Sequence, residues 1–470
     1  MVGRFFKHQH ETAHTPPADN ETPLVLEPIV EAVQEEEKEA SNLSDHSAPD
    51  FVNERVTLHR YLIDKINLSI LDTMEEDEIH DELRPLVRSY AKEQNFPLSS
   101  SELEVLIKDI GDEMLGLGPI EPLLEDDSIS DILIVGAQTV YIERFGKLKT
   151  TKVRFKDDDH LLRIINKIVA SVGRRVDESS PLVDARLADG SRVNVAIRPV
   201  AVDGPQVSIR KFSKHPYSLD KLIANQALAK GMAMLLAAAV EGKISIVVSG
   251  GTGSGKTTML NALSSYIPHD ERLVTIEDAA ELQLQQPHVV RLETRPPTID
   301  GRNEIVQRDL VKNSLRMRPD RIIIGEVRGG EAFDMLQAMN TGHEGSMSTI
   351  HANNPRDAIA RLEQMVGMAG MPMTQTAIRS QITSAIDVIV QLERLRDGAR
   401  RVTSISEITG MEGDVVQLQE LMYYKRLGVD ENGKIQGEFR ATGMRPTFLE
   451  DLKTMGLNLD QSTFDPSRAL

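Results

Sequence analysis

The chain has 470 residues, of which 40% are hydrophobic, and this is enough to fill the cores of several domains of roughly 100–200 residues each. It contains no cysteine, which excludes disulfides, thiolate zinc sites and cysteine nucleophiles. The net charge of −18 argues against non-specific binding of nucleic acid, because such binding needs Lys and Arg to neutralise phosphates.

The amino-terminal part divides into a tail and a helical region. Residues 1–50 hold 11 acidic and 3 basic residues, several prolines and few large apolar side chains, so we expect a disordered acidic tail. From residue 51 the spacing of apolar residues becomes helical. It predicts amphipathic helices around 58–70, 79–87 and 103–114, and therefore a small helical bundle over 51–116.

A mixed domain is expected next, after the boundary that Gly116–Pro119 marks. Short strands are predicted at 132–135 and 140–143, around a turn at 136–138, and again at 192–197 and 206–210; a helix is predicted at 160–172. These elements indicate an α+β domain over 117–212. The following residues, 213–219, read as a linker.

After residue 219 helical segments alternate with short β-branched strands at 244–248, 273–276 and 321–324. This alternation is typical of a parallel α/β sheet. We therefore expect an α/β domain over 220–425 and a carboxyl-terminal extension over 426–470. The longest apolar run, 232–240, ends at Glu241, far short of the ~20 residues that a membrane span needs.

A glycine-rich loop lies between the first of these strands and a predicted helix at 256–266. Its sequence fits G-x-x-x-x-G-K-[ST], a loop whose backbone N–H groups turn toward phosphates. Lys256 would supply a positive charge to the β- and γ-phosphates, and Thr257 a hydroxyl to Mg²⁺, while the helix points its positive end at the anion. The residues predicted to bind ATP are Gly250, Gly251, Thr252, Gly253, Ser254, Gly255, Lys256, Thr257 and Thr258.

Carboxylates follow two of the predicted strands. Glu277 and Asp278 end one strand, and Glu326 ends another. Ligands of open α/β sheets bind at the carboxyl ends of strands, and ATP hydrolysis needs carboxylates to hold the metal and to position water. We expect Glu277 and Glu326 to face the glycine loop, whereas Asp278 is equally a candidate helix cap.

Four ordered motifs resemble the secretion ATPases of type II secretion, type IV pili and conjugation-type secretion. They are the glycine loop, an acidic box at 275–281, a Walker B region at 315–328 and a His box at 341–353. Segments at 116–124, 140–144, 189–194 and 207–212 resemble, more narrowly, the tight-adherence (Flp) pilus assembly ATPases of the CpaF/TadA type. The four-cysteine zinc module of many type II secretion and pilus-extension ATPases is missing, which points away from those branches.

This resemblance implies an α/β fold: a RecA-like P-loop ATPase domain with a preceding PAS-like α+β domain and an amino-terminal helical bundle. It gives Lys256 a catalytic role beside phosphate binding and makes Glu277 the candidate catalytic base. Glu326 would bind Mg²⁺ through water or order the attacking water, and the sequence leaves open how the two acids divide this work. His343 and His351 would sense the γ-phosphate or couple it to movement.

Two arginines of the preceding domain complete the expected site. Arg192 and Arg210 would reach the nucleotide as charge stabilisers, from the same subunit or a neighbouring one, because arginine stays protonated and presents a planar fork. The alternative for both is an ordinary surface salt bridge. If they do reach the nucleotide, ATP would close the two domains over the cleft and hydrolysis would release them.

The resemblance further implies a cytoplasmic homohexamer that uses ATP and Mg²⁺ to drive assembly of a tight-adherence pilus, and the sequence leaves open whether it also drives retraction. Its expected partners are inner-membrane pilus platform proteins, with membrane contact indirect and no nucleic acid bound directly. One alternative is a conjugation-type (type IV) secretion ATPase that exports DNA or proteins. Another is a RecA-like recombinase or helicase, which the negative charge and the 4% aromatic content disfavour. A third is a nucleotide-gated scaffold.

Overall fold

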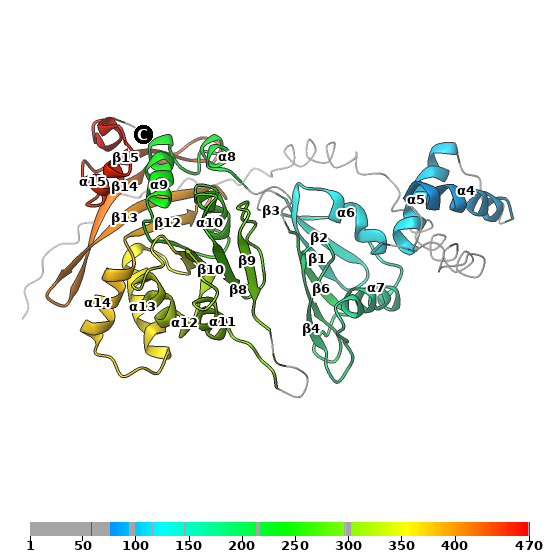
Figure 1. Ribbon diagram of the computed structural model, residues 1–470. Coiled ribbons are helices and arrows are strands. Elements are labelled where there is room, and N and C mark those ends of the chain that lie inside the picture. Colours follow the sequence, from blue (N-terminus) through cyan, green and yellow to red (C-terminus); the bar gives the residue numbers. More distant parts are fainter. Residues whose placement is uncertain are drawn as a thin grey trace, which may run out of the picture. The chain divides into compact units, whose positions relative to one another are not determined.

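The structure is a computed structural model that describes residues 58, 76–93, 99–114, 116–144, 147–212, 217–295, 297, 302–468 and 470. These residues fall into two compact units, and Figure 1 labels most of their elements. The first unit comprises the described residues up to Pro119 together with 152–160, and the second comprises 120–151 and 161–470. No helix among the described residues has both the length and the apolar character that crossing a membrane requires.

The first unit contains two helices, α4 (Glu76–Glu93) and α5 (Ser100–Met114). Their apolar stripes face each other, so that Leu83, Val87 and Ile107 are buried in one cluster with Leu58. The predicted helices at 79–87 and 103–114 are therefore confirmed. The predicted tail over 1–50 and, apart from Leu58, the predicted helix at 58–70 lie outside the described residues.

A six-stranded antiparallel sheet with the order β3-β2-β1-β6-β5-β4 opens the second unit. Its elements are α6 (Glu121–Glu125), β1 (Ile129–Val135), β2 (Thr139–Arg144), β3 (Lys147–Thr150), α7 (Asp158–Ser171), β4 (Leu182–Arg186), β5 (Arg192–Ala196) and β6 (Gln206–Arg210). The predicted strands, helix and turn are confirmed. The sequence reading missed β3 and β4, the two edge strands, and every side chain of β3 is exposed.

A nine-stranded sheet forms the rest of the second unit, in the order β15-β14-β13-β12-β7-β11-β10-β8-β9. The strands from β12 to β9 in this order run parallel, and β13, β14 and β15 extend the sheet in antiparallel pairs. The strands are β7 (Ile246–Gly250), β8 (Leu273–Glu277), β9 (Val289–Glu293), β10 (Arg321–Val327), β11 (Met347–Ile350), β12 (Val388–Arg394), β13 (Arg400–Glu412), β14 (Val415–Val429) and β15 (Ile435–Ala441).

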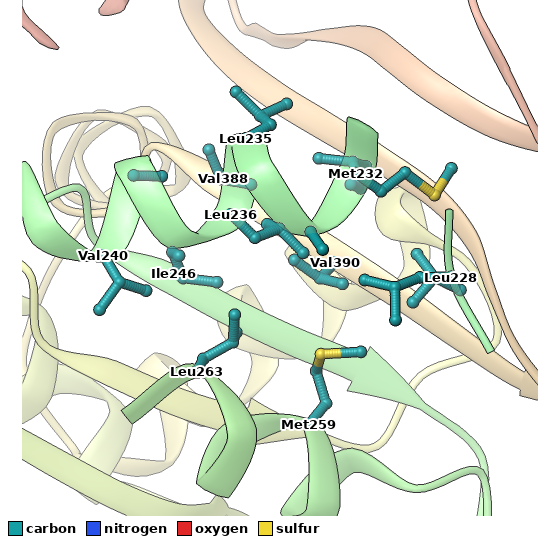
Figure 2. Packing of buried hydrophobic residues seen from close by; sticks show 14 of the residues in the cluster. Leu228, Met232, Leu235, Leu236, Val240, Ile246, Met259, Leu263, Val388 and Val390 are labelled. Carbon is teal, nitrogen blue, oxygen red and sulfur yellow. The ribbon is translucent and has the colours of Figure 1, made fainter. Parts of the chain in front are cut away.

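Helices bury both faces of this sheet. Alternate residues of β7 enter different clusters, Ile246 and Val248 on one face and Val247 on the other, as the pleat requires. Figure 2 shows Leu236 of α9 and Met259 of α10 packed with Ile246 in the first cluster. The helices are α8 (Leu219–Ala224), α9 (Lys230–Glu241), α10 (Lys256–Ser264), α11 (Gln307–Ser314), α12 (Glu331–Met339), α13 (Pro355–Met368), α14 (Gln375–Ala385) and α15 (Leu449–Thr454).

The last 45 residues continue the sheet and its core. The boundary predicted at residue 425 falls inside β14, and β15 pairs with that strand. Ala441, Phe448 and Leu452 are buried in the same cluster as β7. Residues 426–470 therefore complete the α/β layer, because β14 needs a partner on its outer edge and apolar cover on its face.

Candidate nucleotide-binding site

The glycine loop joins β7 to α10, and its backbone cannot carry ordinary side chains. Gly253 and Gly255 have φ of 68° and 97°, in the left-handed region that favours glycine. A Cβ on Gly250 would lie 2.6 Å from the carbonyl oxygen of Leu392 and 2.4 Å from Ser254 Oγ. The glycines therefore permit a tight loop that leads directly into α10 after Gly255.

Lys256 holds its charge inside this loop. Its Nζ donates to the carbonyl oxygens of Gly250 and Gly251 at 3.1 and 3.0 Å. Burial lowers the pKa of Lys256, while the negative charge of Glu326 acts in the opposite direction. An ammonium held by two neutral carbonyl groups in a desolvated position is ready to exchange them for an anion, since a charge-assisted hydrogen bond is the stronger one.

Glu277, the last residue of β8, is a buried carboxylate that is only half satisfied. It is 3% exposed. Its Oε1 accepts the N–H groups of Glu281 and Leu282 at 2.8 and 3.0 Å, whereas its Oε2 has no hydrogen-bond partner among the described residues. Burial raises the pKa of Glu277. An oriented, desolvated carboxylate with one oxygen left over is suited to accept a proton from water.

Gly325 makes room for this carboxylate. The strands β8 and β10 are parallel neighbours, with Ile276 opposite Ile324. A Cβ on Gly325 would lie 2.8 Å from Glu277 Cγ and 3.3 Å from its Oε1. The absence of a side chain at Gly325 therefore sets where the Glu277 side chain can lie.

Glu326 follows Gly325 in β10 and is paired with an arginine. Its Oε2 accepts Nη2 of Arg328 at 2.6 Å, and Nη1 of the same arginine lies 3.3 Å from Asp278 Oδ2. The hydrogen bond to Glu326 raises the pKa of Arg328. Arg328 thus links Asp278, which follows β8, to Glu326 near the end of β10. Arg328 is part of the Walker B segment, but no motif in the sequence predicts this role for it.

The two histidines lie at opposite ends of β11. Residue Ile350 of β11 lies opposite Ser249 of β7, so His351 leaves the sheet at the edge that carries the glycine loop. His343 precedes β11 and its Nδ1 lies 3.2 Å from the carbonyl oxygen of Ala338, at the end of α12. The structure therefore brings His351, and not His343, to the loop's edge of the sheet.

Arg192 and Arg210 are direct register partners on β5 and β6. Arg192 Nη1 lies 2.6 Å from Glu281 Oε1, and its Nη2 donates to the carbonyl oxygen of Ala279 at 3.2 Å. Arg210 is paired with Asp131 of its own sheet, at 3.2 Å. Both arginines line a cavity of about 170 Å³ together with Thr257 and Thr258. They therefore share a cavity with the first turn of α10. Each also makes a salt bridge, which is the alternative role that the sequence left open for both arginines.

A metal ion would depend on the nucleotide for some of its ligands. Within the described part of the chain, no three or more His, Asp or Glu side chains converge into a metal cluster. Mg²⁺ usually binds one or two protein oxygens, several waters and the phosphates of its substrate, so such a cluster is not required. The Thr257 hydroxyl and the Glu326 carboxylate fit this pattern.

Comparison with known proteins shows the family to which the chain belongs. The family described as "Type II/IV secretion system protein" matches residues 113–445. The chain belongs to this family. A putative conjugal transfer protein of Mycobacterium tuberculosis is 37% identical over 324 residues, which cover 68% of this chain and 92% of that one. The type IV secretion system protein VirB11 of Bartonella quintana is 32% identical over 330 residues, covering 62% and 91%. The conjugal transfer protein TrbB of Rhizobium radiobacter is 33% identical over 299 residues, covering 63% and 88%.

Solved structures of secretion-family proteins are also similar to the chain. The VirB11 ATPase of Brucella suis in complex with sulphate has a TM-score of 0.33 at 28% identity, covering 61% of this chain and 94% of that one. The pilus retraction motor PilT with bound ADP has a TM-score of 0.46 at 21% identity, covering 64% and 81%.

The family assignment confirms the resemblance to secretion ATPases and the predicted fold class. The narrower resemblance to tight-adherence pilus ATPases is not confirmed and stays a prediction. The relatives named above are described by conjugal transfer and type IV secretion.

Proposed function

We propose that this secretion-family protein hydrolyses ATP at the edge of the nine-stranded sheet and uses the energy to drive a conjugation-type (type IV) secretion machine. The observation that carries the proposal is the position of Glu277. A buried carboxylate ends β8, and one of its oxygens has no hydrogen-bond partner in the part of the chain that the structure describes; it lies at the same edge of the sheet as the glycine loop that ends β7. Phosphate binding and proton acceptance are the two functions that ATP hydrolysis requires of the protein.

The residues divide this work by their chemistry. The glycine loop and the amino end of α10 bind the phosphates, and Lys256 leaves the carbonyl groups of Gly250 and Gly251 for the β- and γ-phosphates. Glu277 accepts the proton of the attacking water through Oε2. Thr257 and Glu326 would hold Mg²⁺, which would supply positive charge to the phosphates when bound.

Coupling to movement is proposed for the residues around this centre. Arg192 contacts Glu281, four residues after the proposed base, and shares a cavity with Thr257. His351 lies next to the glycine loop at the edge of the sheet, where it can respond to the γ-phosphate. We propose that the phosphates compete with Glu281 for Arg192, so that the preceding α+β domain responds to the nucleotide.

The choice of machine rests on the relatives. The descriptions of the M. tuberculosis, R. radiobacter and B. quintana proteins favour conjugation-type secretion over the tight-adherence pilus. Pilus assembly is the second candidate, supported by the amino-terminal segments around 116–124 and 207–212. In either machine we propose a cytoplasmic homohexamer that acts at the inner membrane through a membrane partner protein.

Hydrolysis is tested by measuring phosphate release from the purified full chain with ATP and Mg²⁺. We expect Lys256→Ala and Glu277→Gln to reduce turnover at least 100-fold, because removal of one preorganised catalytic group costs on the order of 10²–10⁴-fold. The control is Glu241→Gln, a charge change at an exposed acid at the end of α9. Wild-type turnover in both active-site variants would refute the proposal.

The machine is tested in the cells that encode the protein. If Lys256→Ala introduced into the native gene abolishes DNA transfer or protein export while surface pili persist, conjugation-type secretion is supported. Loss of pili with export intact would favour the tight-adherence alternative. Light scattering with ATP and Mg²⁺ tests the ring, and a protein that stays monomeric would contradict a hexamer.

A further inference from the structure

A hairpin of two strands stands beside the glycine loop. β12 runs parallel to β7, and Leu392 is the register partner of Gly250, the first loop residue. Arg394, two residues further along, ends β12, and Arg400 begins β13 directly opposite it. The tip of the β12–β13 hairpin therefore passes the glycine loop at the edge where the phosphates are expected.

Both arginines reach the loop itself. Arg400 Nε donates to the carbonyl oxygen of Gly253 at 2.9 Å, and its Cδ lies 3.5 Å from where a Cβ on Gly255 would be. Arg394 Nη1 lies 3.5 Å from where a Cβ on Gly253 would be. Two guanidinium groups therefore border the two glycines whose left-handed backbone forms the phosphate cradle.

The register of the hairpin puts like charges opposite each other at this point. Arg394 faces Arg400, whereas the adjacent pair, Glu393 and Arg401, joins opposite charges. Lys256, inside the same loop, adds a third positive charge. A polyanion at the loop would therefore meet three positively charged side chains.

The hairpin is held in place from both sides. Asp397 in its turn accepts the N–H groups of Ala399 and of Ile435 on β15, at 3.0 and 2.8 Å. Arg401 Nη1 donates to the carbonyl oxygen of Gln226, after α8, at 2.6 Å. The hairpin therefore presents Arg394 and Arg400 from a fixed frame, and little ordering is left to be done when a ligand arrives.

We propose that Arg394 and Arg400 bind the α- and β-phosphates of the nucleotide, across the loop from Glu277 and Glu326. The inference rests on the proposed function in one respect, that the glycine loop binds a nucleoside triphosphate. Backbone N–H groups of such a loop cradle the α- and β-phosphates, and the arginines lie against the same loop at Gly253 and Gly255. Arginine suits this role because its planar fork matches phosphate oxygens.

This assignment makes a kinetic prediction. The α- and β-phosphates are present in ATP and in ADP, so the arginines bind substrate and product alike. Loss of such uniform binding raises KM and leaves kcat nearly unchanged. Loss of Glu277, by contrast, lowers kcat.

The test compares the full-length wild type with Arg400→Ala, Arg394→Ala and Arg400→Lys by calorimetric titration with ATP, ADP and inorganic tripolyphosphate. We expect each alanine variant to bind all three ligands about 10- to 100-fold more weakly, since the free energy of a hydrogen bond to a charged group corresponds to roughly this change in affinity. Arg400→Lys should recover part of the loss. The matched control is Arg396→Ala, which removes one positive charge from the turn of the same hairpin.

Salt dependence separates phosphate binding from a purely structural hold on Gly253. If the guanidinium groups bind phosphates, the ATP affinity of the wild type falls with rising ionic strength, and the ATP affinity of each alanine variant falls less steeply. An unchanged salt dependence would overturn the inference. Weaker ATP binding with unchanged tripolyphosphate binding would also overturn it, because the arginines would then contact the base or ribose.

The proposed function is tested separately in the same titrations. If the alanine variants bind all three ligands as the wild type does, while Lys256→Ala does not bind them, the inference fails and the nucleotide site stands. If the wild type itself binds neither ATP nor ADP, the proposed function fails. Thermal unfolding of each variant shows that the compared proteins are folded.

Discussion

Gly325→Ala places one methyl group where the structure has no room for it. The new Cβ would lie 2.8 Å from Cγ of Glu277 and 3.3 Å from its Oε1, closer than unbonded carbon and oxygen atoms normally approach. The backbone of Gly325 is not in the left-handed region, so contact alone determines the outcome. Either the Glu277 side chain moves, or β10 moves away from β8.

The magnitude follows from how far the carboxylate must shift. An ordinary contact lies between 3.4 and 4 Å, so Cγ must yield by roughly 0.6–1.2 Å. Misplacement of a reacting group by about 1 Å can cost on the order of 10²-fold in rate. Overpacking of a core position costs about 1–3 kcal/mol of stability. We therefore expect kcat to fall about 100-fold, with a smaller change in nucleotide affinity.

The assay is steady-state ATP hydrolysis, with nucleotide affinity and urea unfolding measured on the same samples. The matched control is Gly367→Ala in α13, where an added Cβ meets nothing within 4 Å. That substitution should leave turnover unchanged and stabilise the helix by up to about 1 kcal/mol. If Gly325→Ala hydrolyses ATP at the wild-type rate, Gly325 does not set the position of a catalytic carboxylate.

Four further predictions concern buried groups and the two histidines. Because burial raises the pKa of Glu277, turnover should be lost, as the pH falls, at a higher pH than an ordinary glutamate would give, and a rate–pH profile without this shift would contradict the role. The same raised pKa means that ionisation of Glu277 destabilises the folded wild type as the pH rises through that pKa, whereas Glu277→Gln does not ionise. The free energy of unfolding of Glu277→Gln should therefore rise relative to that of the wild type, which urea unfolding at several pH values measures. Arg321→Ala should cost about 3–5 kcal/mol of unfolding free energy, because it leaves the Glu271 carboxylate buried without its bidentate partner; a loss below 1 kcal/mol would contradict this. His351→Ala should lower ATP turnover about tenfold or more. His343→Ala should leave nucleotide affinity unchanged. If the two variants had equal effects on hydrolysis and on nucleotide titration, β11 would not separate the roles of the two histidines.

The sequence predicted the parts of the fold whose signal is local. The strands leading to Gly250 and Glu277 are short, apolar and buried on both faces, so their composition reveals them. The edge strand β3 is Lys-Leu-Lys-Thr with every residue exposed, and it carries no such pattern. β14 mixes polar and apolar residues along 15 positions, and only its pairing with β13 and β15 identifies it as part of the sheet.

The same distinction holds for the site. Glu277 and Glu326 were predicted because each follows a recognisable strand, and parallel strands bring their carboxyl ends to one edge. His343 and His351 share one motif, yet the strand between them carries them to opposite edges. Arg394 and Arg400 were missed because they lie about 140 residues after the loop that they contact, and only the β7–β12 pairing brings them there.

The strand order also determines when, during translation, the strands that flank the glycine loop become available. β7 emerges from the ribosome with the glycine loop, but its two neighbours, β11 and β12, begin only at Met347 and Val388. At a translation rate of about 5–20 residues per second, both flanking strands have been synthesised only on the order of 10–30 s after the loop. If the glycine loop binds ATP as proposed, the complete site forms only after most of the α/β domain has been translated.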